Sequence, residues 1–272
     1  TRFNAIDKTK EYGCQGVELV LNDETPDGST PMEYAKALCA HAKEQGLEVP
    51  IYTTGANFFV KEPEKELERL CRHIDIAAEC KIPLLRHDVA WGYTGIKSYK
   101  KVIEAVAPLV RQTAEYARER GVKTCSENHG YLLQDSVRML ELFAAVDHPN
   151  YGFLCDMGNF TVVDEDCATA VSALSDYIVH VHAKDMLVRS GMNFDPGRGY
   201  NLSRGGNYWR GTIFGHGNVP TFQILSAIRK SGYDGYVSLE FEGMEPVLEG
   251  VEIGTQNLQH MIEVIGEGQR YV

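Results

Sequence analysis

The sequence lacks most of the features that mark specialised classes of protein. Its seven cysteines are scattered and form no C-x-x-C pair, so they predict reduced thiols rather than a disulfide framework or a zinc ribbon. Basic residues are scarce, with 27 Lys and Arg against 38 Asp and Glu, and the net charge of -11 argues against nucleic acid or a membrane surface as a partner. No apolar run reaches the roughly 18 residues of a membrane helix, and no secretory signal opens the chain. We therefore expect a cytoplasmic protein with no nucleic-acid or membrane partner.

Short apolar runs alternate with longer stretches of helical periodicity along the chain. The runs that predict strands are Gly16–Val20, Glu48–Thr54, Ile82–His87, Val122–Asn128, Tyr151–Met157, Tyr177–Lys184 and Tyr236–Glu242. The stretches that predict helices are Pro31–Gln45, Glu64–Cys80, Tyr99–Arg120, Ser136–Val146, Thr221–Lys230 and Val251–Ile265. This alternation predicts an α/β protein with a parallel sheet, whose strands are buried on both faces.

Two features favour a closed (β/α)₈ TIM barrel over an open doubly wound sheet. The open sheet usually carries a G-x-G-x-x-G turn after its first strand, and the sequence has none. The 272 residues also fit one barrel of about 250 residues, and no Pro-, Gly- or Ser-rich linker divides them, so we expect a single domain over residues 1–272. A barrel needs eight strands, and Arg2–Gly13 has the pattern of a helix. We therefore expect the first strand to lie upstream of Thr1.

Ionisable side chains follow five consecutive predicted strands at their carboxyl ends, where barrel active sites lie. They are Arg86, His87 and Asp88, then Glu127 and His129, then Asp156, then His182 and Lys184, and then Glu240 and Glu242. Carboxylates that converge in a barrel would repel one another, and a bound cation removes the repulsion. Three carboxylates and one imidazole suit one divalent ion, Mn²⁺ first, with Mg²⁺, Co²⁺ or Zn²⁺ as alternatives: Glu127, Asp156, His182 and Glu240. Glu242 shares the face of Glu240 and competes with it for this role.

Five sequence segments give the chain a family resemblance. They are SENHG at 126–130, LCDMGNF at 154–160, VHVHAKD at 179–185, GHGNVP at 215–220 and GYDGYVSLEFEG at 232–243. With these segments in this order, nearly the whole chain resembles the sugar phosphate isomerase/epimerase family of xylose-isomerase-like TIM barrels. The resemblance implies that the same four residues hold one metal and that Glu127 and Glu240 are also the catalytic acid/base groups. Ketose 3-epimerases of the family often have a histidine where this chain has Asn159, so their substrate preference does not transfer directly.

The expected activity is isomerisation or epimerisation of a sugar, a sugar phosphate or a polyol ketone. A substrate that chelates the cation through a carbonyl and a neighbouring hydroxyl has an acidified α-proton, because the cation stabilises the enediolate. One carboxylate removes this proton, and the other, or the same one, returns it. Return to the adjacent carbon isomerises the substrate, return to the opposite face epimerises it, and expulsion of a β-hydroxyl dehydrates it.

Three alternatives stay open at this point. A lyase or dehydratase, such as an inosose dehydratase or a keto-glycoside-cleaving enzyme, shares the first chemical step. An abasic-DNA endonuclease shares the fold, but it uses more histidine ligands and needs a basic surface, which the net charge opposes. A non-catalytic binding barrel is disfavoured because Glu127 and Glu240 are both present. The sequence leaves the identity of the sugar and the metal open, and homo-oligomerisation as well.

Further side chains near the strand ends are candidates for binding substrate. His87 and His129 could contact a hydroxyl group, with a packed histidine and a solvated loop histidine as the respective alternatives. Lys184 lies two residues past His182, on the same side of the strand, so it could steady the enediolate or pair with a carboxylate. His180 shares that side at a deeper position, where we expect a hydrogen-bonded core residue.

One long segment, Met186–Val219, is predicted to be irregular. Loops longer than about 12–15 residues are uncommon in compact domains unless they are functional or disordered. The segment begins beside the strand of His182 and contains Arg210 and His216, which we expect to bind a phosphate or carboxylate of the substrate. We expect it to fold over the site as a lid, with packing against another subunit as the alternative.

Overall fold

The computed structural model describes residues 1–92 and 95–266. The chain forms two compact units. Unit 1 contains Thr1–Leu133 and Leu140–Phe153, and unit 2 contains Gln134–Met139 and the chain from Leu154 onwards. The chain passes from one unit to the other after Leu133, within helix α5 (Ser136–Val146) and within strand β5 (Tyr151–Asp156). The expectation of a single domain over residues 1–272 stays a prediction.

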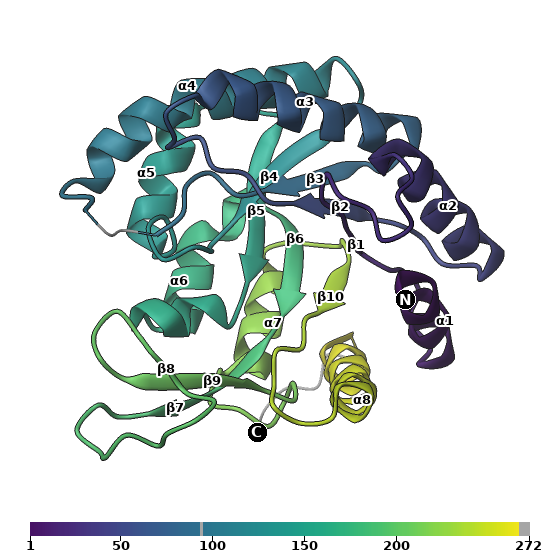
Figure 1. Ribbon diagram of the computed structural model, residues 1–272. Helices are drawn as coiled ribbons and strands as arrows, with labels where there is room; N and C mark the ends of the chain where they lie inside the picture. The colour runs from purple at the N-terminus through teal and green to yellow at the C-terminus, as the bar shows by residue number, and fades with distance from the viewer. Residues whose placement is uncertain (93–94, 267–272) are drawn as a thin grey trace. The chain divides into compact units, whose positions relative to one another are not determined.

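Four strands of unit 1 lie side by side in parallel, in the order β1, β2, β3, β4 (Figure 1). Their bounds are Leu19–Val20, Ile51–Thr54, Leu84–His87 and Lys123–Glu127. The register places Tyr52 opposite Leu19 on one side and Leu85 on the other, and all three side chains are buried. Burial on both faces is the reason why these strands appear in the sequence as continuous apolar runs.

The helices of unit 1 are α1 (Arg2–Glu11), α2 (Pro31–Glu44), α3 (Pro63–Glu79) and α4 (Tyr99–Arg118), together with most of α5. Figure 1 shows α3 and α4 along one side of β3 and β4. At the start of α2, Thr30 accepts from the Glu33 backbone N–H while Glu33 accepts from that of Thr30, which satisfies two donors at the helix end. The chain leaves this helix at Gly46, whose φ of +70° favours glycine. Helix α1 confirms the predicted helical character of the first residues.

Unit 2 pairs β6 (Ile178–Ala183) in parallel with β10 (Val237–Leu239), with His182 opposite Ser238. The end of β5 joins them, because the Met157 backbone N–H donates to the carbonyl oxygen of His182 at 3.2 Å. Its helices are η1 (Asn159–Val163), α6 (Cys167–Leu174), η2 (Ser175–Tyr177), α7 (Thr221–Lys230) and α8 (Val247–Gly266). Strands β1 to β4 of unit 1, together with β5, β6 and β10, lie within the seven predicted strand ranges, one in each.

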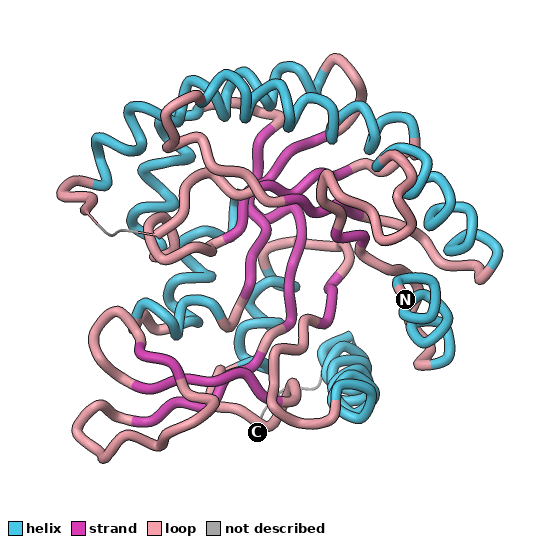
Figure 2. Tube along the Cα trace, in the orientation of Figure 1, coloured by secondary structure: helices cyan, strands magenta, loops and turns pink. Residues whose placement is uncertain are grey.

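The segment predicted to be irregular, Met186–Val219, instead contains a small antiparallel sheet in the order β7-β9-β8 (Figure 2). The strands are β7 (Asp185–Arg189), β8 (Asn201–Leu202) and β9 (Tyr208–Thr212). The prediction was wrong because short strands between glycines carry no readable alternation, whereas pairing of β7 with β9 satisfies their backbone groups. Helix α6 also went unpredicted, because it is only eight residues long. Within the described ranges, no helix has the length and apolar content needed to cross a lipid bilayer.

Candidate metal centre

Three of the predicted metal ligands lie together in unit 2. Asp156 is the last residue of β5, His182 lies near the end of β6, and Glu240 directly follows β10. Each offers a ligand atom within 4.8 Å of those of the other two. His182 Nδ1 lies 3.0 Å from Glu240 Oε2. The parallel pairing of β6 with β10 produces this contact, because it brings the carboxyl ends of both strands to one edge.

The turn after β5 fixes the orientation of the Asp156 carboxylate. Its Oδ1 accepts hydrogen bonds from the backbone N–H groups of Gly158, at 2.8 Å, and Asn159, at 2.9 Å. The side chain is fully buried, and its Oδ2 faces the Lys184 ammonium group at 3.0 Å. One oxygen is thus held by the backbone, and the other is directed to a cation.

Lys184 is the cation at the centre of this cluster. Its Nζ lies 3.0 Å from Asp156, 3.1 Å from Glu240 and 3.0 Å from Glu242, and only 3% of its side chain is exposed. Burial by itself raises the pKa of Glu240, but the positive charge of Lys184 and the hydrogen bond with His182 outweigh burial and hold that pKa well below its ordinary value. The Glu240 carboxylate is therefore ionised near neutral pH and available to a cation.

These residues fit a divalent ion. Lys184 contacts three carboxylates, those of Asp156, Glu240 and Glu242, so these four side chains together carry more formal negative than positive charge. Two carboxylates and one imidazole within ligand distance of one another are a donor set that suits Mn²⁺, Mg²⁺ and similar ions. Glu240 is the partner of His182, whereas Glu242 is more exposed, with 53% of its side chain accessible against 33% for Glu240.

The fourth predicted ligand, Glu127, ends β4 in unit 1 and is buried there. Arg86 from β3 contacts its Oε2 at 2.7 Å and also contacts Asp88 at 2.8 Å. His129 Nδ1 lies 3.1 Å from Asp88. Burial alone would lower the pKa of His129, but its hydrogen bond with Asp88 and the charge of Glu127 raise that pKa overall. Arg86 and His129 thus form a positively charged setting for two buried carboxylates.

His87 is enclosed in unit 1. It is fully buried, its Nδ1 lies 2.8 Å from the carbonyl oxygen of Asp88, and its ring contacts the rings of Phe58 and Tyr151. Burial lowers its pKa to about 4, so the ring is neutral at pH 7. The structure therefore favours the packed-histidine alternative for this residue. His180 is likewise buried and hydrogen-bonded, with Nε2 2.8 Å from Ser238 Oγ, as the sequence predicts.

Asp185 organises the segment that contains His216, and the sequence reasoning missed it. Its two carboxylate oxygens accept from four backbone N–H groups, those of Met186 at 2.8 Å, Val219 at 3.2 Å, Gly215 at 3.0 Å and Gly217 at 2.7 Å. His216 lies between Gly215 and Gly217 in the turn that Asp185 holds, and its side chain is exposed. The sequence feature that could have indicated Asp185 is its position directly after Lys184, at the end of the VHVHAKD segment.

Arg210 lies on β9 and pairs with Glu245, with 3.4 Å between their charged atoms. Glu245 also accepts from Thr212 at 2.9 Å. The guanidinium group of Arg210 lies 5.8 Å from the centre of the Tyr200 ring. A phosphate or carboxylate of a substrate would have to compete with Glu245 for this guanidinium group.

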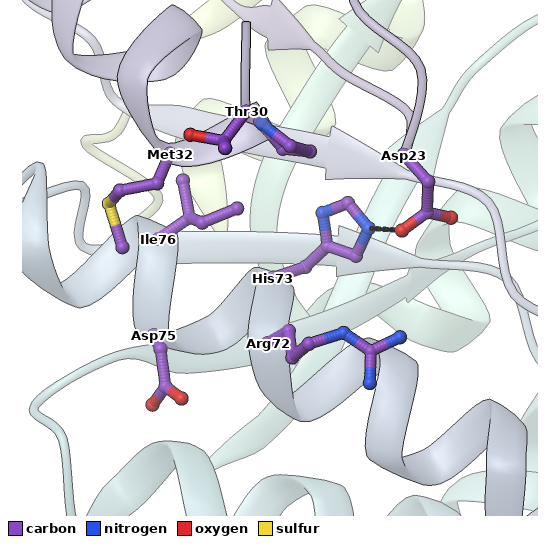
Figure 3. A pocket seen from close by; sticks show the side chains of 8 residues that line it. Asp23, Thr30, Met32, Arg72, His73, Asp75 and Ile76 are labelled. Carbon is purple, nitrogen blue, oxygen red and sulfur yellow. Dashed lines mark hydrogen bonds and ion pairs between the residues drawn. The ribbon is translucent and has the colours of Figure 1, made fainter.

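Unit 1 also contains a cavity of about 440 Å³ (Figure 3). It is lined by Asp23, Thr30, Pro31, Met32, Arg72, His73, Asp75 and Ile76, none of which is a predicted site residue. Within it, His73 Nε2 lies 3.2 Å from Asp23, and His73 Nδ1 lies 2.6 Å from the Tyr52 hydroxyl group. Because both ring nitrogens are engaged in the structure, His73 is a fixed part of the wall.

Comparison with known proteins gives a family match over almost the whole chain. A family model described as a xylose isomerase-like TIM barrel matches residues 6–265. An inosose dehydratase of Lacticaseibacillus casei is 28% identical over 142 residues, which are 51% of this chain and 47% of that protein. The match thus spans about half the length of this curated relative.

Solved structures share the fold at low identity. D-psicose 3-epimerase from Clostridium cellulolyticum H10, solved with D-tagatose, has a TM-score of 0.73 and 18% identity, with 97% of this chain and 93% of that chain covered. A xylose isomerase-like TIM barrel protein from Mycobacterium smegmatis, solved in complex with magnesium, has a TM-score of 0.72 and 16% identity, with 97% and 88% covered.

Proposed function

The chain belongs to the xylose isomerase-like TIM barrel family, and we propose that it is a divalent-metal-dependent enzyme that isomerises or epimerises a sugar, a sugar phosphate or a polyol ketone. The single observation that carries the proposal is the cluster of Asp156, His182 and Glu240 in unit 2, whose ligand atoms lie within 4.8 Å of one another. Such a cluster is costly to bury unless a cation balances it.

We further propose Glu127 as the fourth ligand, because it ends β4, and active sites of TIM barrels are assembled from the carboxyl ends of several strands. A bound divalent ion would supply the Lewis acidity that makes a proton next to a carbonyl acidic. One of Glu240 and Glu127 would then remove that proton as the base, and the other, or the same one once it is protonated, would return a proton as the acid. Arg86 lies 2.7 Å from Glu127 Oε2 and restricts the position of this carboxylate.

Substrate contacts are proposed for four residues around these carboxylates. His129 and Lys184 are donors to substrate oxygens, and Arg210 and His216 recognise an anionic group on the substrate. The segment that carries Arg210 and His216 is proposed to act as the lid, with its turn fixed by Asp185. Replacement of Arg210 by Ala is expected to raise KM and to leave metal content unchanged, whereas unchanged turnover at low substrate concentration would contradict the lid role.

The deciding experiment measures exchange of substrate protons with solvent. Chelator-treated protein is reloaded with Mn²⁺ and mixed with a panel of keto-sugars and polyol ketones in deuterium oxide, and incorporation is followed by NMR. We expect deuterium at the carbon next to the carbonyl, and loss of incorporation in Glu240→Gln by about 10²–10⁴-fold. Glu252→Gln, which removes the same charge at an exposed position of α8, is the control. Absence of exchange across the panel with the metal bound would overturn the proposal.

A dehydratase is the second candidate, favoured by the similarity to inosose dehydratase over half of the chain. The first proton abstraction is the same, but a β-hydroxyl group then leaves as water. Mass spectrometry of the products separates the two outcomes, because an isomer keeps the mass of the substrate and a dehydration product is lighter by one water.

A further inference from the structure

The structure places an ammonium group where a divalent ion would have to bind. Lys184 Nζ lies 3.0 Å from Asp156 Oδ2 and 3.1 Å from Glu240 Oε2. Asp156 has no second oxygen to offer, because its Oδ1 already accepts from two backbone N–H groups of the following turn. A cation that binds Asp156 must therefore take the oxygen that Lys184 holds.

The stem of Lys184 leaves little freedom for the side chain as a whole. A Cβ atom at Gly158 would lie 3.1 Å from Lys184 Cγ and 2.9 Å from its carbonyl oxygen, so the stem packs directly on the glycine. Only the outer part of the side chain can move without disturbing the turn that holds Asp156.

A second position for the ammonium group is already present. Glu242 Oε2 lies 3.0 Å from Nζ, and Asn159 Oδ1 lies 3.3 Å from it. The Glu242 side chain is 53% exposed, so it can follow a shift of the ammonium group without a cost in packing. The charges also match this exchange, since Lys184 would neutralise Glu242 while a divalent ion would neutralise Asp156 and Glu240.

We propose that Lys184 is a built-in competitor of the divalent ion, occupying the Asp156 and Glu240 oxygens until it is displaced onto Glu242. This inference rests on the proposed function, since it presupposes a divalent ion at Asp156, His182 and Glu240. Without the ion, the ammonium group compensates carboxylates that would otherwise repel one another in a buried site. The affinity for the ion is then set by an exchange of cations.

The test measures Mn²⁺ affinity of the chelator-treated full chain by isothermal titration calorimetry. In Lys184→Met the competing charge is gone and the stem is retained, so we expect Mn²⁺ to bind at least about tenfold more tightly. In Glu242→Gln the displaced ammonium group loses its acceptor, so we expect binding about tenfold weaker than in the wild type. In the double variant that combines Lys184→Met with Glu242→Gln, the second change should have little further effect on Mn²⁺ affinity, because there is no ammonium group for Glu242 to accept.

Two exposed positions in unit 2 provide matched controls. Lys230→Met on α7 and Glu249→Gln on α8 remove the same charges at a surface, and we expect Mn²⁺ affinity within about twofold of the wild type. If Lys184→Met does not fold without metal, Glu242→Gln decides the matter, and unchanged affinity in that variant overturns the inference. Equal or weaker binding in a folded Lys184→Met overturns it as well. If the wild type itself binds neither Mn²⁺ nor Mg²⁺, the proposed function fails.

Discussion

Replacement of Asp185 by Asn should destabilise the protein strongly, although the two side chains have almost the same shape. The carboxylate accepts four backbone N–H groups, two on each oxygen, and is buried. An amide offers one acceptor and one donor, so two of these N–H groups would face an NH₂ group. A buried donor without an acceptor costs about 1–3 kcal/mol, which gives a loss of about 2–6 kcal/mol in the free energy of unfolding.

Urea unfolding at pH 7 and 25 °C, followed by circular dichroism, measures this loss directly. Asp195→Asn is the control, because Asp195 is exposed and accepts from one backbone N–H group, that of Gly197, at 2.7 Å. We expect the control to change stability by less than about 1 kcal/mol. A loss below about 1 kcal/mol in Asp185→Asn itself would refute the assignment of Asp185 as the residue that fixes this turn.

Three other changes test single features of unit 1. Burial lowers the pKa of His87 to about 4. Between pH 6.5 and pH 4 this histidine is therefore protonated in the unfolded chain but neutral in the folded chain, and the free energy of unfolding should fall by about 3 kcal/mol as the pH drops through this range. Urea titrations should show this dependence largely lost in His87→Gln, and an identical slope in both proteins would contradict it. Thr30→Ala removes the cap that accepts from Glu33 and should cost about 1 kcal/mol in thermal unfolding. Tyr52→Phe leaves His73 Nδ1 buried without its 2.6 Å partner and should cost about 1–3 kcal/mol, whereas an unchanged midpoint in urea would show that the hydroxyl group is dispensable.

Much of the fold could be predicted because the parallel strands are short, apolar and buried on both faces. Tyr52 and Leu85 are opposite each other in the core, and each lies within a run that the sequence marks clearly. The sheet β7-β9-β8 could not be predicted in this way. Burial in β7 and β9 changes from one end of the strand to the other instead of alternating, and the two strands depend on pairing with each other, which periodicity along one strand does not encode.

The candidate site divides along the same line. Asp156, His182 and Glu240 could be predicted, because residues that end parallel strands meet at one edge. The reach of Lys184 to three carboxylates could not, since periodicity gives the side of a strand on which a residue lies but not where a long side chain ends. The burial of His87 depended on rings from distant segments, which spacing along the chain does not reveal.

Gly158 has a consequence for how this protein can change over evolutionary time. Its backbone N–H holds Asp156, and its missing side chain makes room for the stem of Lys184. Any other residue at this position would displace an acid and a base together, and no single second mutation at either would restore both. The glycine, the aspartate and the lysine should therefore be inherited as one block. Descendants that diverge in substrate would be expected to do so through β7-β9-β8, a separate antiparallel sheet that supplies none of these three residues.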